Sequence, residues 1–572
     1  RVLRRCIATG RAAERHAAPR FGKDVHFVNT LKRDQIVRGV PVARIDEDGH
    51  GVVELYVRKE AQEFEFTFER AIPGEKLHLR VESAKRDRYN KKKPGRYRLL
   101  VEQRGAASVN EVTPTCAHFE EKCGGCSFQH LAYEAQLREK HSLLSFRLNQ
   151  YGLGNVEPGF PLKSPETYSF HSRTEFKFFL RNGLHMGLHP IRNPVPVTVN
   201  RCHLHPHGSQ LAFDATLVAA RKEPGVQIFD QRTGRGWLCS AVFRGAMRPH
   251  AGESAVLVTL VTIPMVTEAE FDVLHRLAKS ITEECSDVVG VMWSATGGEP
   301  QERVAGWRST SSDAQQLLAG QSSLEHQICK MSIKTVPEAF LRPNLLVIDA
   351  ICQAVLRFSG VQPNDVVWDA FCGQGPLSVL LAKQCRHLVG LERSSPALVA
   401  CEQNLATNGV GHNTQLLSID LGSPAALRLL GARLPQDWFV AAEKDVVDDD
   451  LPADLEDSHP DDHPGLHTSQ PPENVSVQTG ISGQPSGDSV PLPDVLVVDP
   501  GRNGLPKAFR RMIYNLGART IVLLGSGRPL LRDCVLLSRR GYEIQKMESF
   551  DSYPHTARLE TIVQLHLRGL QG

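Results

Sequence analysis

The chain has 572 residues, of which 41% are hydrophobic and 23% charged, and its formal net charge is +3. This composition excludes disordered, collagen-like and membrane-spanning proteins, because it can fill hydrophobic cores and contains no apolar run long enough to cross a bilayer. The length exceeds what one hydrophobic core usually supports, so we expect a multidomain protein.

A basic extension, residues 1–31, comes first. From Arg1 to Lys23 arginine is frequent and acidic residues are scarce, which is typical of an organelle transit segment. A disordered basic tail has the same composition, so that alternative stays open. The transit interpretation predicts a location in the mitochondrial matrix, and the alternative location is the cytoplasm.

Residues 32–105 are predicted to form a small antiparallel β-barrel. Alternating hydrophobic runs, among them 51–57 and 76–81, are separated by turn-forming residues such as those at 73–74. This alternation and these breaks are typical of short paired strands.

A basic cluster ends this segment. Its members are Lys85, Arg86, Arg88, Lys91, Lys92, Lys93, Arg96 and Arg98. Tyr89 and Tyr97 are interleaved with them. Clustered cations neutralise phosphates, and interleaved aromatic rings can stack on bases. A solvated turn is the plain alternative for an isolated charge run, but the neighbouring barrel favours an RNA-binding surface.

The next segment, residues 106–335, contains cysteines at metal-ligand spacing. Cys116, Cys123 and Cys126 are separated by six and then two residues, and Cys202 is the candidate for a fourth ligand. From spacing alone, zinc and an iron-sulfur cluster both stay open, with a redox CxxC behind them. The thirteen cysteines of the chain favour a reducing compartment over a disulfide framework.

The same segment is predicted to be a central β-rich domain. One helix is expected at Tyr133–Leu148 because of its apolar spacing. The stretch Thr174–Trp293 has the pattern of strands with turn-rich joints.

Residues 336–572 alternate between helices and strands. Helices are predicted at 345–358, 377–383 and 396–407, and strands at 365–369, 388–391 and 494–499. This alternation predicts a doubly wound, Rossmann-like parallel sheet. Residues 443–493 are rich in Asp, Pro, Ser and Gly, a composition that cannot bury a core, so we expect a loop insertion there.

The first strand of this sheet is followed by a candidate nucleoside-binding loop. Gly373 and Gly375 precede a helix, where a ligand can approach the backbone. Glu392 ends the next strand, where a carboxylate can accept hydrogen bonds from ribose hydroxyls. A nicotinamide cofactor is the competing ligand, but Asp369 would repel a pyrophosphate and suits the cationic amino-acid end of S-adenosylmethionine.

Taken together, these segments resemble the family of RNA uracil-C5 methyltransferases, in particular the branch with a TRAM domain and a 4Fe-4S cluster. The match is most specific at Cys-Gly-Gly-Cys-Ser-Phe-Gln-His-Leu, residues 123–131. Residues 369–375, 499–504 and 554–560 resemble the family's cofactor loop, its Asp-Pro-x-Arg-x-Gly motif and the segment with its catalytic base.

The resemblance implies a role for each matching residue. The cluster ligands fall on Cys116, Cys123, Cys126 and Cys202. S-adenosylmethionine falls on Asp369, Phe371, Gly373, Gly375, Glu392 and Asp420, with Arg342 near the methyl donor. Asp499 matches the aspartate that contacts the target uracil, and Glu560 matches the base that removes the proton from carbon 5.

The cysteine nucleophile of the family has no counterpart in this alignment. Family members add a thiolate to carbon 6, because carbon 5 of uracil is too weak a nucleophile to be methylated unaided. Counting back from the Arg532-Asp533 pair places Gly525 at the cysteine position. The unactivated hydroxyl of Ser526 is a poor substitute, and Cys534 is expected to point into the following helix.

Arg342 is a second departure, because it replaces the glutamine of the family's Phe-x-Gln-x-Asn motif. A fixed cation is disfavoured beside a sulfonium unless it is paired. The two departures predict a catalytically impaired protein that binds RNA, preferably rRNA, as an RNA-binding or ribosome-assembly factor. The alternative is an active 5-methyluridine methyltransferase of rRNA or tRNA, which Asp499 and Glu560 favour, so the sequence leaves open whether the chain is an enzyme.

The expected partners follow from these functions. They are rRNA within an assembly particle, together with ribosomal proteins or assembly factors. The acidic insertion could dock a basic ribosomal protein or be a solvated loop. A redox module fits less well, because the cysteines lie within an RNA-recognition framework.

Overall fold

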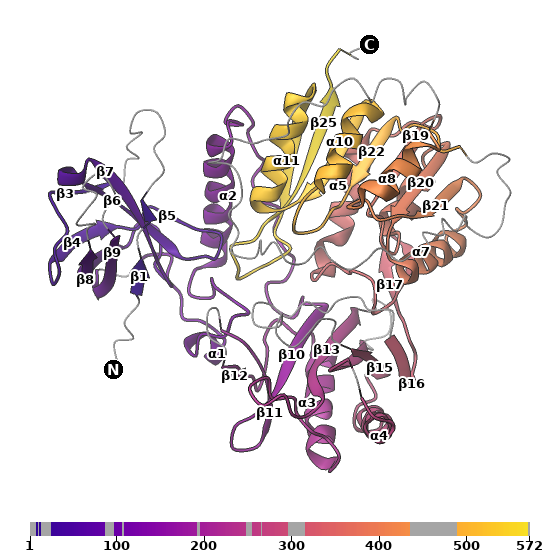
Figure 1. Cartoon of the computed structure of the whole chain (residues 1–572), viewed down its shortest axis with the longest axis horizontal. Coiled ribbons are helices and arrows are strands. Elements are labelled where there is room, and N and C mark those ends of the chain that lie inside the picture. The colour runs from indigo at the N-terminus through magenta and orange to yellow at the C-terminus, as the bar shows by residue number, and fades with distance from the viewer. Residues whose placement is uncertain are drawn as a thin grey trace.

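The computed structural model describes residues 7–9, 11–12, 25–85, 96–105, 108–190, 195–247, 254–264, 266–295, 315–434 and 489–569. Figure 1 shows a β-rich module at one end, a central sheet domain, and a C-terminal α/β domain. The basic residues Arg86, Arg88, Lys91, Lys92 and Lys93 lie outside the described residues, as do residues 443–488 of the acidic insertion.

The N-terminal module contains two sheets around one core. Its elements are β1 (Ile7–Thr9), β2 (Arg11–Ala12), β3 (His26–Val28), β4 (Ile36–Pro41), β5 (Arg44–Ile45), β6 (Gly51–Val57), η1 (Arg58–Glu60), β7 (Gln62–Phe68), β8 (Lys76–Lys85) and β9 (Arg96–Arg104). One sheet has the order β1-β9-β8-β4 and the other β2-β7-β6-β3, with β5 on β6. Phe64, Phe66 and Phe68 alternate along β7 and are buried between the sheets, so the period-two pattern sets the core face.

The central domain is a mixed sheet with helices packed on it. It contains α1 (Ala117–Glu120), α2 (Tyr133–Gln150), β10 (Arg173–Leu180), β11 (Leu184–Leu188), β12 (Val197–Thr198), α3 (His207–Lys222), β13 (Leu238–Met247), β14 (Ser254–Thr262), α4 (Glu268–Glu284), β15 (Val288–Ala295), β16 (Gln315–Gly320), β17 (Leu324–Ile328) and β18 (Met331–Thr335). The sheet order is β12-β11-β10-β13-β14-β15-β16, and β17 and β18 form a separate hairpin.

The sequence prediction for this domain was incomplete. The helix predicted at Tyr133–Leu148 is confirmed as α2. The stretch Thr174–Trp293 also contains α3 and α4, which were predicted as part of a strand-rich layer. Both helices pack on the sheet through buried residues, so the domain is α/β rather than β-rich.

The C-terminal domain has a seven-stranded sheet in the order β21-β20-β19-β22-β23-β25-β24. Its elements are η3 (Leu345–Val347), α5 (Ile348–Ser359), β19 (Val366–Ala370), α6 (Pro376–Ala382), β20 (His387–Glu392), α7 (Ser395–Thr407), β21 (Thr414–Ser418), α8 (Pro424–Gly431), β22 (Val495–Val498), α10 (Lys507–Leu516), β23 (Thr520–Gly525), α11 (Gly527–Arg539), β24 (Tyr542–Phe550) and β25 (Glu560–Leu567). All pairs from β21 to β23 are parallel, and β25 is antiparallel to both of its neighbours. The helices and strands predicted between residues 345 and 407 are confirmed within a few residues.

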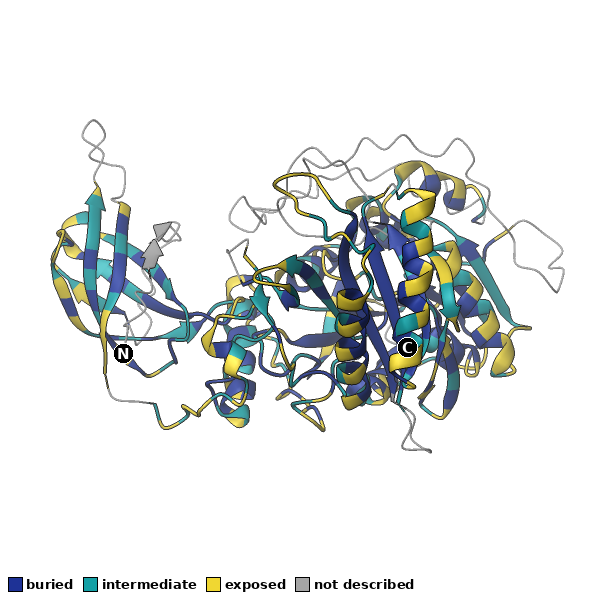
Figure 2. Cartoon of the chain, turned by 90° about the horizontal axis from the view of Figure 1, so that it is seen from below, coloured by how far each residue is buried: buried dark blue, intermediate teal, exposed yellow. Residues whose placement is uncertain are grey.

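Both faces of this sheet are covered. Residues of α5, α6 and α7 pack on one face, and residues of α8, α10 and α11 pack on the other. The inner strands are therefore nearly continuous apolar runs, such as Val495–Val498 in β22. Figure 2 shows these strands buried along most of their length, while the helices carry exposed residues on their outer sides.

The helix α2 lies between the N-terminal module and the C-terminal domain (Figure 1). Its last turns contribute Leu148 to the core beneath β22 and β23. Among the described residues, no helix combines the length and apolar character that a membrane span requires.

Candidate functional site

The candidate site lies at the carboxyl edge of the C-terminal sheet, where open α/β sheets bind ligands. Asp369 lies at the end of β19, Asp499 directly follows β22, and Gly525 ends β23. β25 runs in the opposite direction, so its first residue, Glu560, lies at the same edge. Gly525 pairs with Thr561, which places the expected nucleophile position beside the expected base.

Arg342 bridges the two carboxylates of this edge. Its Nη2 lies 2.7 Å from Asp499 Oδ2, and its Nη1 forms an ion pair with Glu560 Oε1. The second oxygen of Glu560 accepts a hydrogen bond from Ser552 Oγ at 2.6 Å. Burial acts to lower the pKa of Arg342, but the charges of Asp499 and Glu560 outweigh it and raise this pKa above its ordinary value. Arg342 is therefore a permanent cation that occupies both carboxylates.

The backbone next to Arg342 is fixed by the central domain. Ser172 Oγ donates to the Arg342 carbonyl at 2.8 Å, and Ser172 N donates to the Pro343 carbonyl at 2.6 Å. Asn344 is fully buried and donates to Ser164 Oγ at 2.9 Å. No local sequence signal indicated Ser164 or Ser172 as functional, because they reach this segment only through the tertiary fold.

Gly525 has an ordinary strand conformation with little space for a side chain. A Cβ atom there would lie 3.3 Å from Leu530 Cβ and 3.4 Å from Leu530 Cδ1. Ser526 is extended and does not cap α11 with its side chain. Cys534 lies on α11 and is 0% exposed, and burial raises the pKa of its thiol, so it cannot replace the missing thiolate.

The other thiols of the described residues do not fill this gap. Outside the four candidate cluster ligands, Cys329 is the one cysteine there that is not buried. It contacts Asp349 and Gln353 at the start of α5. The charge of Cys352 interacts with Arg342, but a hydrogen bond with Cys329 and burial raise the pKa of Cys352 well above its ordinary value.

The cofactor loop contains an acidic group suited to a cation. Asp369 Oδ2 accepts from Ser378 Oγ at 2.6 Å, while its Oδ1 is buried without a hydrogen-bond partner. Burial raises the pKa of Asp369 to about 7, and the charges of Asp499 and Glu392 act in the same direction. An ammonium or sulfonium bound nearby would stabilise the ionised carboxylate.

The glycines of this loop let its backbone pass close to helix α7 and to the end of β20. Gly373 and Gly375 have φ values of +56° and +83°. A Cβ atom at Gly375 would lie 2.4 Å from Cys401 Sγ, whereas one at Gly373 would meet nothing within 4 Å. Glu392 Oε2 accepts from Gly373 N at 3.2 Å, so the carboxylate expected to hold ribose faces the loop.

The two remaining candidates follow strands β19 and β21. Phe371 packs edge-on against Phe509, with ring centroids 5.8 Å apart. Asp420 is exposed just after β21 and accepts from Gly422 N at 2.8 Å. The orphaned Asp369 oxygen, the open glycine loop and Glu392 together fit the amino-acid and ribose ends of S-adenosylmethionine.

The four candidate cluster cysteines come together at one place. Burial raises the pKa of Cys123, Cys126 and Cys202, and the neighbouring cysteines of the group, Cys116 among them, raise each pKa further. Gln129 Nε2 donates to Cys126 Sγ at 3.2 Å. Backbone N–H groups reach the sulfurs of Cys123 and Cys202. Such N–H···S bonds stabilise thiolates, the form that binds a metal.

The cysteine segment is joined directly to the segment that carries Glu560. Ser127 N and Phe128 N donate to the His555 carbonyl at 2.8 and 2.9 Å. His555 N in turn donates to Gln136 Oε1 at 2.9 Å. Because Gln136 also donates to the Phe128 carbonyl, α2 fixes both segments at once.

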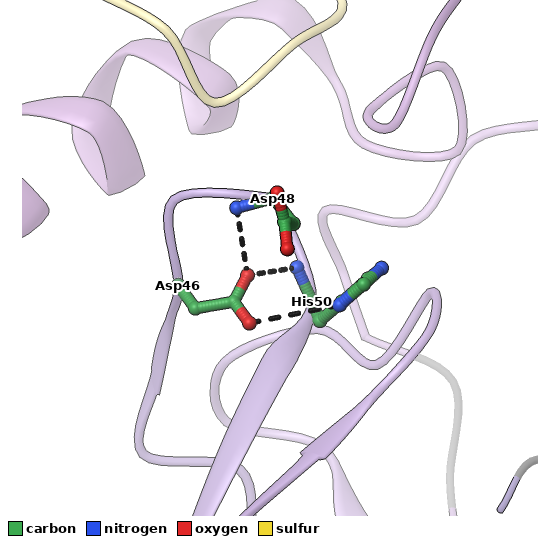
Figure 3. Close-up of side chains that lie close together, drawn as sticks. All are labelled: Asp46, Asp48 and His50. Atoms are coloured by element: carbon green, nitrogen blue, oxygen red, sulfur yellow. Dashed lines mark hydrogen bonds and ion pairs between the residues drawn. The ribbon is translucent and has the colours of Figure 1, made fainter. Parts of the chain in front are cut away.

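The N-terminal module contacts the same region through the turn between β5 and β6. Asp46 Oδ1 accepts from Asp48 N at 3.0 Å and from His50 N at 2.8 Å, and Oδ2 lies 3.6 Å from His50 Nδ1 (Figure 3). These contacts satisfy the Asp46 carboxylate within the turn. Next to it, Glu47 lies 3.2 Å from Arg528 of α11, so the module rests beside the loop that follows Gly525.

The described members of the basic cluster lie at the ends of β8 and β9. Lys85 and Arg96 are exposed, and Arg98 pairs with Glu82 at 2.8 Å. Two positive side chains therefore remain available to an anion on this part of the module.

Comparison with known proteins shows that this chain is similar to RNA methyltransferases. No protein-family model matches the chain. An uncharacterized RNA methyltransferase of Caldanaerobacter subterraneus is 23% identical over 495 residues, which cover 86% of this chain and 91% of the relative. One from Listeria innocua is 23% identical over 544 residues, which cover 94% and 99%. One from Nitratidesulfovibrio vulgaris is 25% identical over 512 residues, which cover 87% and 90%.

The chain is a distant relative of these RNA methyltransferases. The solved structure of Pyrococcus abyssi tRNA (uracil-54, C5)-methyltransferase in complex with S-adenosyl-L-homocysteine matches it with a TM-score of 0.57 at 17% identity, covering 92% of this chain and 99% of that chain. This likeness confirms a multidomain α/β fold with a Rossmann-like C-terminal domain.

Proposed function

We propose that this chain has the fold of a uracil-C5 methyltransferase but that its methyl transfer is impaired. We propose further that it binds RNA, in particular rRNA, and serves as an RNA-binding factor in ribosome assembly. The observation that carries the proposal is the guanidinium of Arg342 between Asp499 and Glu560. Gly525 at the position of the family nucleophile supports it independently.

Both features remove a step that methylation of uracil needs. A nucleophile must add to carbon 6 before carbon 5 can attack a methyl group, and glycine offers none. A base must then take the proton from carbon 5 so that the carbon 6 bond can break. Arg342 pairs with one oxygen of Glu560 and Ser552 donates to the other, so Glu560 can take that proton only at the expense of its ion pair with Arg342.

S-adenosylmethionine, when bound, supplies the methyl group. Asp369 would hold its cationic end and Glu392 its ribose, and Gly373 would let the cofactor come close to the backbone. These residues and the carboxylates at the sheet edge favour a second candidate function, an active 5-methyluridine methyltransferase of rRNA or tRNA. That function requires Arg342 to leave Glu560 and another group to supply the nucleophile.

The cysteine site supports a 4Fe-4S cluster as its occupant. A single zinc ion with Zn–S bonds of about 2.3 Å would hold four sulfurs roughly 3.8 Å apart. In the described ranges, only the group of Asp46, Asp48 and His50 has three or more potential ligand atoms that all lie within 4.8 Å of one another. No three of the cysteine sulfurs are therefore that close together, so they are spaced more widely than the sulfurs of a zinc site. A four-iron cluster accommodates this wider spacing, and N–H···S contacts are typical of its ligands.

RNA as the partner is supported by the relatives, which are named RNA methyltransferases, and by the basic residues at the ends of β8 and β9. The arginine-rich residues 1–23 support the mitochondrial matrix as the location. We propose that the protein is located in the mitochondrial matrix and that its partners are rRNA, ribosomal proteins and assembly factors.

A methylation assay tests the proposal. The unaltered chain, Gly525→Cys, Arg342→Gln and the double variant are each incubated with labelled methyl donor and with rRNA and tRNA of the source organism. We expect no 5-methyluridine from the unaltered chain and clear formation by the double variant. Ser526→Cys combined with Arg342→Gln is the matched control, because its thiol lies one residue away. Methylation by the unaltered chain would refute the impaired function and support the second candidate.

A further inference from the structure

Arg173 lies beside the backbone of Arg342 without a strong acidic partner. It directly follows Ser172, which hydrogen-bonds the main chain of Arg342 and Pro343. Its nearest carboxylate, that of Glu175, is 3.9 Å away. That carboxylate already accepts hydrogen bonds from Lys177 and Ser240, so it compensates Arg173 only in part.

Two further arginines flank the carboxylates that Arg342 bridges. Arg502 lies three residues after Asp499, and Arg558 lies two residues before Glu560. Arg502 and Arg558 are both exposed. Within the described ranges, neither of them forms an ion pair with an acidic side chain.

Arg342 joins the three segments that carry these arginines, because Ser172 binds its carbonyl while Asp499 and Glu560 bind its guanidinium. Apart from burial, the charge of Arg502 acts on both Arg173 and Arg558 and lowers the pKa of each. Among the described residues, the carboxylate whose charge acts on Arg558 is that of Asp48. Three like charges from the central domain and from two loops of the C-terminal domain therefore gather at one place, which costs free energy unless an anion lies between them.

We propose that Arg173, Arg502 and Arg558 form an anion site that takes a phosphodiester of the RNA backbone beside the Arg342 centre. Guanidinium groups suit this ligand, because each can donate two parallel hydrogen bonds to phosphate oxygens. A phosphate there joins the central domain to the C-terminal domain. The site rests on the proposed RNA binding but needs no methyl transfer, so RNA can be held against the centre without turnover.

The salt dependence of RNA binding tests this site. Each phosphate of single-stranded RNA that the protein neutralises contributes about 0.7 to the slope of log affinity against log salt concentration. Binding of a single-stranded RNA oligonucleotide of mixed sequence is measured for the full chain, for the single Gln variants at the three positions, and for the triple variant. We expect the triple variant, which leaves this one phosphate without its cations, to lose about 0.7 from the slope.

Matched controls separate this site from general charge. Arg276→Gln and Arg357→Gln remove exposed arginines that pair with Glu223 and Glu548, and we expect both to keep the full slope. The Arg502→Gln, Arg558→Gln double variant leaves the packed Arg173 in place. It therefore still measures the salt dependence of the site if the triple variant fails to fold. An RNA with neutral methylphosphonate linkages should bind the unaltered chain and the triple variant alike.

The outcomes distinguish this inference from the proposed function. A full slope in the double and triple variants would overturn the anion site and leave RNA binding intact. A reduced slope together with 5-methyluridine formation by the unaltered chain would support the anion site and overturn impaired catalysis. Failure of the unaltered chain to bind RNA at low salt would overturn both.

Discussion

Replacing Lys140 by methionine should destabilise the chain strongly, because it leaves the buried carboxylate of Asp551 without its cationic partner. Lys140 Nζ donates to Asp551 Oδ1 at 2.6 Å and to the Tyr553 carbonyl at 3.0 Å, and both side chains of the ion pair are 0% exposed. Removing one partner of a buried ion pair costs about 3–5 kcal/mol. Lys163→Met opens the exposed pair with Glu134 and should cost less than about 1 kcal/mol.

A double variant separates charge from shape at this position. Lys140→Met with Asp551→Asn removes both charges, so we expect it to recover most of the stability that Lys140→Met loses. Urea unfolding of the unaltered chain, Lys140→Met, Asp551→Asn, the double variant and Lys163→Met gives each free energy of unfolding, and the departure from additivity between the two single variants and the double variant gives the coupling between the pair. Equal losses in Lys140→Met and Lys163→Met, or strictly additive effects in the double variant, would refute the reasoning.

The pH dependence gives an independent check on Lys140. Burial lowers its pKa, and the opposing charge of Asp551 does not fully offset this. Between that lowered pKa and the ordinary value of 10.5, the unfolded chain binds more protons than the folded chain. Stability should therefore rise with pH across this window, and the charge-free double variant should lack that rise.

Two further predictions concern the cofactor loop and the cluster. Binding of S-adenosylmethionine should strengthen from about pH 6 to about pH 8, as Asp369 ionises through its pKa of about 7; calorimetry on Asp369→Asn should show weaker binding without that rise, and an equal rise in the variant would contradict the assignment. Cys126→Ser should lose iron and the visible absorbance of an iron-sulfur cluster when purified without oxygen, and stoichiometric zinc in the unaltered chain would contradict a 4Fe-4S cluster.

The C-terminal sheet could be predicted from the sequence because its signals are local. Strands such as β19 and β22 are short apolar runs, and the helices between them have 3.6-residue spacing. The central helices were missed for a related reason. The buried side of α3 is built largely from alanines, among them Ala212, Ala215 and Ala219, which give a weak periodic signal. α4 did carry a readable start, the capping box of Thr267 and Glu270.

The arrangement of the site could be predicted only in part. The sequence indicated which residues lie at the carboxyl ends of strands, and the sheet brings Asp369, Asp499 and Gly525 to one edge. It could not indicate the partners of Arg342, because Asp499 and Glu560 are 157 and 218 positions away. A cation that looked unfavourable in the sequence is compensated by two carboxylates in the fold.

The two departures from the family pattern act on different steps of one reaction, so reversing either alone should not restore turnover. A thiol introduced by Gly525→Cys can add to carbon 6, but Glu560 remains paired with Arg342 and can take the proton from carbon 5 only at the expense of that ion pair. That variant should accumulate a covalent protein–RNA adduct that survives denaturing electrophoresis. Adding Arg342→Gln frees Glu560, so the adduct should resolve into methylated RNA. Full turnover by Gly525→Cys alone would show that RNA binding opens the Arg342 ion pair, and the closed centre would then be a resting state rather than a block.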